Sequence, residues 1–202
     1  MNAKKLLALI LALLLVFSCG ALADTIEEKQ QVYTDSTVYT LPDGEQFLVP
    51  VQYTVIVKGD GSGNDDLLDQ LISVAYGVID GDANYFTFGR SDLGMPELNL
   101  ADMTEKEMDE FAASMAEQFA ASLSTEEIPH YEIMPGVYQP YIHFSAIDMS
   151  AAAGVPVYWT VNVTIINGIM YQANYYTQES FCSFDEQWAL SMMIDTLTLG
   201  AD

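Results

Sequence analysis

Only a few residues of this sequence have side chains suited to covalent chemistry, and the most reactive type among them is a cysteine. Cys182 stands directly before Ser183, where a Ser-x-x-Glu pattern ending at Glu186 predicts the start of a helix. The positive end of a helix can lower the pKa of a thiol, but a catalytic thiolate also needs a base. The only histidines in the sequence are His130 and His143. A cysteine packed as a small apolar side chain is the commoner arrangement, so we predict no catalytic residue.

The two histidines also raise the question of a metal site. His130 and Glu132 would share one face of a strand, because side chains alternate along it, and His143 could join them only from a neighbouring strand. Zinc needs three or four such ligands held together, and we interpret these residues instead as exposed or edge side chains. Acidic loops at Asp60–Asn64 and Asp80–Asn84 lack the Gly and Glu that a calcium-binding EF-hand loop requires. We therefore expect no metal and no other cofactor.

Non-covalent recognition is a third kind of chemistry, and a polar row on two adjacent strands could provide it. Residues 157–165 and 169–175 alternate apolar and polar side chains. Aromatic rings interleaved with amides can stack on and hydrogen-bond a neutral polar ligand such as a glycan or a peptide. The same composition is also typical of any solvated strand. The candidate ligand-binding residues of this row are Tyr158, Asn162, Gln172, Asn174 and Tyr176.

That row exists only if the two strands pair in one particular register. A two-residue loop at Asn167-Gly168 pairs Ile166 with Ile169 and sets valines opposite amides. A three-residue loop instead pairs Ile165 with Ile169 and aligns both apolar rows on one face. Because a slip of one residue moves every side chain to the other face, we predict the three-residue loop, with Gly168 in the left-handed conformation that such loops need.

Two amphipathic helices are expected to cover the sheet that contains these strands. Thr104 and Glu107 form a capping-box pattern, and the apolar residues after it recur at helical spacing, namely Met108, Phe111, Met115, Phe119 and Leu123. A second stripe near the C-terminus consists of Leu190, Met193, Ile194 and Leu197. Alternation and turn signals predict further strands over residues 38–41, 47–58, 85–88, 130–134 and 137–147.

The N-terminus has the features of an export signal. Lys4 and Lys5 precede an apolar run over residues 6–17, which is too short to span a bilayer but suits the core of a signal peptide. Residues 21–23 have the small-x-small pattern at which such leaders are cleaved. We therefore predict a signal peptide over residues 1–23 and a protein that is secreted or held at the extracytoplasmic cell surface.

Cys19 offers an alternative way of processing this leader. Residues 16–19 resemble a lipoprotein box, in which the cysteine is acylated and becomes the first residue of the mature protein, although Phe17 departs from that pattern. Lipidation of Cys19 would tether the protein to a membrane, and without it we expect no membrane attachment. Cleavage after residue 23 would leave Cys182 as the only cysteine, so no disulfide within the mature chain is expected.

The chain that follows the leader is strongly acidic. The net charge is −23, and two of the six basic residues belong to the leader, so four basic residues face 29 acidic ones. A field of this sign repels nucleic acid and anionic membrane surfaces, which leaves a protein, a peptide or a neutral glycan as the expected partner. We predict a flexible N-terminal arm over residues 24–36 and a single α+β domain over residues 37–202.

The order of these elements resembles that of the PsbP-like superfamily. The resemblance is carried by residues 104–123, 157–177 and 183–199. It implies an antiparallel sheet with a long hairpin, covered by two amphipathic α-helices, and most members of that superfamily are binding or assembly proteins. We therefore expect an exported, non-catalytic binding or assembly protein of the cell envelope or extracellular space. The alternatives are a thiol-dependent or hydrolytic extracellular enzyme that uses Cys182, and a structural accessory factor of an envelope complex.

Overall fold

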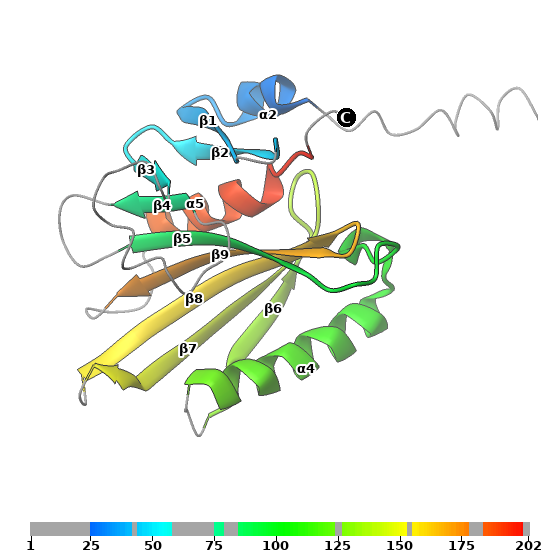
Figure 1. Cartoon of the computed structure of the whole chain (residues 1–202), viewed down its shortest axis with the longest axis vertical. Helices are drawn as coiled ribbons and strands as arrows, with labels where there is room; N and C mark the ends of the chain where they lie inside the picture. The colour runs from blue at the N-terminus through cyan, green and yellow to red at the C-terminus, as the bar shows by residue number, and fades with distance from the viewer. Residues whose placement is uncertain are drawn as a thin grey trace, which may run out of the picture.

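The computed structural model describes residues 25–41, 44–57, 75–78, 85–123, 127–152, 155–177 and 184–199. Within these ranges the chain forms a large antiparallel sheet, a separate β-hairpin and three α-helices (Figure 1). The expected fold class, an antiparallel sheet with a long hairpin and covering helices, is confirmed. The predicted signal peptide, Cys19, Cys182, Ser183 and the two acidic loops lie outside the described residues.

The main sheet has seven antiparallel strands in the order β3-β4-β5-β9-β8-β7-β6. In chain order these are β3 (Thr54–Val57), β4 (Ala75–Val78), β5 (Tyr85–Asp92), β6 (His130–Met134), β7 (Tyr141–Ala152), β8 (Val155–Ile166) and β9 (Ile169–Thr177). The longest strands lie inside the sheet, and β3 and β6 form its two edges. Strand β7 begins directly after Pro140, as expected for a residue that cannot donate to a ladder.

The second sheet is a hairpin of β1 (Ser36–Thr40) and β2 (Gln46–Pro50). The prediction of one strand over residues 47–58 was therefore wrong. Strand β2 ends at Pro50, the backbone N–H of Tyr53 donates to the Pro50 carbonyl at 3.0 Å in a turn, and β3 then joins the main sheet. Alternation of side chains continues across this turn, but Val51 is 61% exposed, so the pattern alone does not reveal the break.

One face of the main sheet is covered by α4 (Glu105–Leu123) (Figure 1). The expected capping box is present, because the backbone N–H of Thr104 donates to Oε2 of Glu107 at 2.8 Å and that of Glu107 donates to Oγ1 of Thr104 at 3.3 Å. The predicted stripe packs on a row of β8, and Phe119 lies edge-on to Trp159 with ring centroids 4.8 Å apart. Among the described residues, no helix has the length and apolarity to cross a membrane.

The opposite face is covered by α5 (Phe184–Asp195). Its predicted apolar stripe is fully buried against a row of β9, namely Tyr171, Ala173 and Tyr175. The far side of α5 meets the β1–β2 hairpin, where the backbone N–H of Leu48 donates to Oγ1 of Thr196 at 2.9 Å. The layers therefore run from α4 through the main sheet and α5 to the hairpin (Figure 1).

The segment before β1 is a packed helix rather than a flexible arm. Helix α2 (Ile26–Val32) is capped by reciprocal hydrogen bonds between Thr25 and Glu28. The buried side chain of Lys29 donates from Nζ to the carbonyls of Thr196 at 3.2 Å and Leu197 at 3.1 Å, where a cation satisfies the free carbonyls after a helix. The predicted arm over residues 24–36 was wrong because these partners are 167 and 168 residues away along the chain.

The long β8–β9 hairpin turns through two residues, so the predicted three-residue loop was wrong. Ile166 pairs with Ile169, and Asn167 and Gly168 are both left-handed, with φ of 50° and 74°, as a type I′ turn requires. The prediction assumed that only one sheet face is buried. Here the apolar row of β8 packs under α4 and that of β9 packs under α5, so turn chemistry decides the register.

Candidate functional site

A hollow of about 290 Å³ opens at the β6 edge of the main sheet, on the face that carries α5. Its walls are side chains of β6, β7 and α5, namely His130, Glu132, Met134, Tyr141, His143, Gln187 and Ser191. Small-ligand sites are usually concave and gather a few polar groups. We call this hollow the edge pocket and treat it as the candidate binding site.

The strand register explains why residues from distant parts of the sequence converge in the edge pocket. Strands β6 and β7 are antiparallel neighbours, and His143 lies directly opposite Glu132. His130 falls on the same face as Glu132 because the two are separated by one residue. Helix α5 adds Gln187 and Ser191, which lie one helical turn apart and therefore side by side on the helix surface. Two strands and one helix thus build the walls.

A buried hydrogen-bond network fixes the back wall of the edge pocket. Asn162 of β8 is 1% exposed. Its Oδ1 lies 2.8 Å from Nδ1 of His143, and its Nδ2 donates to Oγ of Ser191 at 3.4 Å. The hydroxyl of Tyr141 donates to the same Oγ at 2.9 Å, and burial raises the pKa of Tyr141, which keeps that hydroxyl protonated.

This network is compatible with one tautomer of His143 in particular. The amide oxygen of Asn162 faces Nδ1 of the imidazole, and the amide nitrogen of Asn162 donates to Ser191. With its hydrogen on Nδ1, the imidazole donates to Asn162 and keeps a lone pair on Nε2. In that tautomer His143 offers a hydrogen-bond acceptor to a ligand.

The front wall of the edge pocket is open to solvent and carries a negative charge. The side chains of His130 and Glu132 are 69% and 60% exposed, and Nε2 of His130 lies 3.2 Å from Oε1 of Glu132. A carboxylate accepts hydrogen bonds through both oxygens, so Glu132 has capacity for further donors. The pocket combines this carboxylate with the imidazole lone pair of His143, which suits a ligand rich in N–H donors.

The basic residues that the structure describes do little to offset this charge. Lys29 is buried, Arg90 forms an ion pair with Glu45, and Lys106 is exposed beside Glu110 at 3.2 Å. Of these three basic residues, none lines the edge pocket. With a net charge of −23, the field around the pocket attracts cations and repels anions.

The structure separates the five residues predicted to bind a ligand. Tyr158 and Asn162 lie on the face that carries α5, whereas Gln172, Asn174 and Tyr176 lie on the face that carries α4. Asn162 and Asn174 are buried, at 1% and 6% exposed. The prediction of one continuous surface is therefore corrected, because a shift of one residue in register moved half of the row to the other face. Asn162 alone reaches the edge pocket, as the support behind His143.

The histidines lie on neighbouring strands, which was the condition for joining them in a metal site. Among the described residues, however, no three His, Cys, Asp or Glu side chains are close enough together to hold a metal ion. The imidazole of His143 is engaged with Asn162, and His130 turns to Glu132.

Sequence reasoning missed four residues of the edge pocket, namely Met134, Tyr141, Gln187 and Ser191. Gln187 and Ser191 stand four residues apart on the predicted C-terminal helix, which is a signal for a shared polar patch. No sequence pattern near these two residues predicts that they lie beside β6, because the patch and the strand come together only through the order of strands in the sheet.

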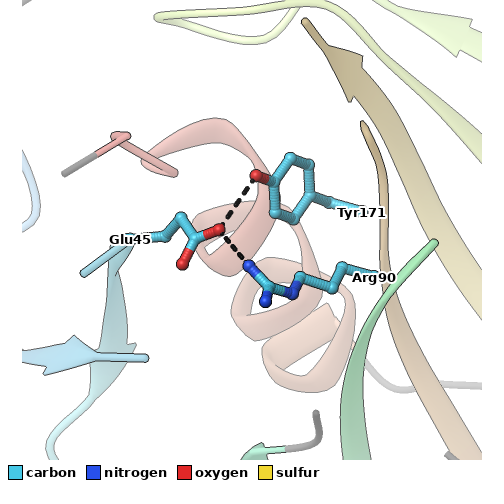
Figure 2. A network of polar contacts seen from close by, with 3 residues as sticks. All are labelled: Glu45, Arg90 and Tyr171. Atoms are coloured by element: carbon cyan, nitrogen blue, oxygen red, sulfur yellow. Dashed lines mark hydrogen bonds and ion pairs between the residues drawn. The ribbon is translucent and has the colours of Figure 1, made fainter. Parts of the chain in front are cut away.

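A second polar cluster docks the β1–β2 hairpin onto the main sheet. Figure 2 shows Glu45 reaching toward Arg90 and Tyr171, which lie opposite each other on β5 and β9. Oε1 of Glu45 accepts hydrogen bonds from Nη1 of Arg90 and from the Tyr171 hydroxyl, the latter at 3.3 Å. Burial and the nearby Glu45 carboxylate raise the pKa of Tyr171 to about 12. The ion pair balances a buried carboxylate, so this cluster has a structural role.

Comparison with known proteins gives similarity at the level of the fold. No family model and no curated protein matches the chain. The solution structure of cyanobacterial PsbP (CyanoP) from Synechocystis is 14% identical, covering 90% of this chain and 97% of that one, with a TM-score of 0.46.

A second similar structure comes from Bacteroides thetaiotaomicron. That crystal structure is 12% identical over 83% of this chain, with a TM-score of 0.48, and this chain spans 50% of its length. Both similarities concern the architecture alone, and no statement about function rests on either one.

Proposed function

We propose that this chain is an exported, non-catalytic binding protein that takes a cationic group of its ligand into the edge pocket. The observation that carries the proposal is the convergence of hydrogen-bond acceptors around Glu132 at a solvent-facing edge of the sheet. A guanidinium or ammonium group matches this lining, because it brings a positive charge and several N–H donors and has no acceptor of its own.

The rigidity of the back wall supports binding as the role of the edge pocket. His143 is held by Asn162, which is itself held by Ser191, so the acceptor on Nε2 stays in place before a ligand arrives. Preorganised groups lose less conformational entropy on binding. The exposed Glu132 can then close on the cation from the front of the pocket.

The proposal of export is based on the leader. It agrees with the strongly acidic composition, which suits a protein that works in solution or at a cell surface. Cleavage after residue 23 gives a mature chain that begins at Asp24, directly before the capped helix α2. Mass spectrometry of the exported protein tests this proposal. A mass that corresponds to a chain beginning at Asp24 supports secretion. A mass that corresponds to a chain beginning at a diacylated Cys19 supports a membrane tether instead.

The direct test of the proposed function compares two small probes that differ in charge. N-acetyl-argininamide carries a guanidinium, and N-acetyl-citrullinamide replaces it with a neutral urea of nearly the same shape. We expect NMR titration of the exported protein to show binding of the arginine probe three- to tenfold tighter, which corresponds to about 0.7–1.4 kcal/mol. The shifts should centre on Tyr141, His143 and Ser191.

Two matched variants separate the edge pocket from the general acidity of the protein. Glu132→Gln removes the carboxylate of the pocket, and Glu97→Gln removes an exposed carboxylate on the loop after β5. Both change the net charge equally. We expect only Glu132→Gln to abolish the preference for the arginine probe. Equal binding of the two probes, or equal effects of the two variants, contradicts the proposal.

A further inference from the structure

Strand β6 ends the main sheet, and one of its two edges faces away from β7. Among the described residues, no hydrogen bond reaches the outward backbone groups of His130–Met134. An edge of this kind is a template for one more strand, and addition of an extended peptide to a sheet edge is a common mode of recognition. The edge pocket is lined by His130, Glu132 and Met134 of the same strand.

The position of Glu132 in the middle of β6 determines what an added strand would present. The residue paired with Glu132 on that strand projects to the same sheet face, with Cβ atoms about 5 Å apart. A lysine or arginine at that position therefore reaches both the Glu132 carboxylate and the edge pocket. A neutral or acidic side chain leaves the carboxylate without a counter-charge.

The residues on either side of Glu132 set a second requirement. Tyr131 and Ile133 are half-buried on the opposite face, and the ring of Tyr131 packs against Phe144 with centroids 6.1 Å apart. The two neighbours of the basic residue on an added strand project to that face. Apolar β-branched or aromatic residues suit both places, because such residues favour strands and extend the existing apolar cluster.

Charge decides between the two kinds of strand that could be added. A second copy of this chain also carries a net charge of −23, and pairing β6 with its own copy would bring carboxylates together at the edge. Like charges in this arrangement are destabilising. A basic segment from another protein is complementary to the same edge, so it is the occupant that the electrostatics select.

We infer that β6 is a docking edge for an extended segment of a partner protein in which a lysine or arginine stands between two β-branched or aromatic residues. The basic side chain enters the edge pocket beside Glu132, and the two neighbours pack beside Tyr131 and Ile133. This inference rests on the proposed function, since it requires the pocket to accept a cation, and it adds the backbone pairing and the sequence pattern of the partner.

The test uses three short peptides and the exported protein. Acetyl-Thr-Val-Arg-Val-Thr-amide carries the full pattern, a second peptide replaces arginine by citrulline, and a third replaces both valines by proline, which cannot support a strand ladder. We expect the first peptide to bind at least tenfold tighter than N-acetyl-argininamide and at least threefold tighter than the citrulline peptide. We expect the proline peptide to bind no better than N-acetyl-argininamide.

Hydrogen exchange locates the bound peptide on the protein. We expect the first peptide to slow exchange of amides within residues 130–134, and Glu132→Gln to weaken its binding while Glu97→Gln does not. Equal affinity of the arginine and proline peptides, or unchanged exchange in β6, overturns the inference. If N-acetyl-argininamide still binds the edge pocket in that case, the proposed function stands without strand addition. If it does not bind, both fail.

Discussion

Nδ1 of His143 and Oδ1 of Asn162 lie 2.8 Å apart, and this bond occupies one of the two nitrogens of this imidazole in the edge pocket. Asn162→Leu keeps the approximate volume of the side chain and removes both of its hydrogen bonds. We expect the free energy of unfolding to fall by about 1–3 kcal/mol, because Nδ1 of His143 loses its acceptor and Oγ of Ser191 loses a donor. The imidazole nitrogen shifts should report Nδ1–H in the native protein and loss of that preference in the variant. An unchanged tautomer would contradict the network.

A second prediction concerns Lys29, which anchors α2. Lys29→Met keeps the aliphatic stem of the side chain and removes the ammonium that donates to Thr196 and Leu197. We expect a loss of about 1.5–3 kcal/mol in urea unfolding, the range for a hydrogen bond to a charged group. Lys106→Met makes the same change at a side chain that is 84% exposed and should cost less than about 0.5 kcal/mol. Equal losses would contradict the buried role of Lys29.

Gly168 tests the close approach between the turn of the long hairpin and the loop after β5. Its φ is +74°, and a Cβ there would lie 2.2 Å from the carbonyl oxygen of Met95. Gly94 has a similar φ of +69° with nothing within 4 Å of its Cβ position, so it is a matched control. We expect Gly94→Ala to cost about 1 kcal/mol from the left-handed backbone alone, and Gly168→Ala to cost at least about 2 kcal/mol more in thermal or urea unfolding. Similar costs would argue against the close approach.

Alkaline pH should weaken the docking of the β1–β2 hairpin through Tyr171. The pKa of this hydroxyl is raised to about 12 in the folded protein, against about 10 in an unfolded chain. Below pH 10 both states are protonated and stability is complete. Between pH 10 and 12 the unfolded chain releases its proton first, so stability falls as pH rises, by at most about 2.7 kcal/mol. Tyr171→Phe should flatten this part of the pH curve, and an unchanged slope would contradict the assignment.

The parts of the fold that could be predicted from the sequence are those set by local chemistry. Thr104 and Glu107 are three residues apart and together cap α4. Their pattern in the sequence is therefore sufficient to predict where this helix begins. Helix α2 has the same kind of cap at Thr25 and Glu28, but the segment is otherwise polar, so its pattern does not predict a packed helix. Local patterns found both covering helices and the strands β5 to β9 of the main sheet.

The hairpin register and the edge pocket depend on non-local facts that no local pattern contains. The predicted three-residue loop depended on the assumption that only one face of the sheet is buried. Helices cover both faces, so that assumption is wrong. The pocket requires β6 to be the neighbour of β7 and α5 to cross the same face. Ser191 and Tyr141 therefore meet at 2.9 Å although 50 residues separate them in the chain.

The central claim is that the edge pocket binds a cationic group, and intermolecular nuclear Overhauser effects test it most directly. The measurement records contacts between the δ-methylene protons of N-acetyl-argininamide and the ring protons of Tyr141 and His143 in the exported protein. We predict contacts to both rings, and their loss in Glu132→Gln but not in Glu97→Gln. Contacts located elsewhere on the protein, or none to either ring at saturating probe, would contradict the claim.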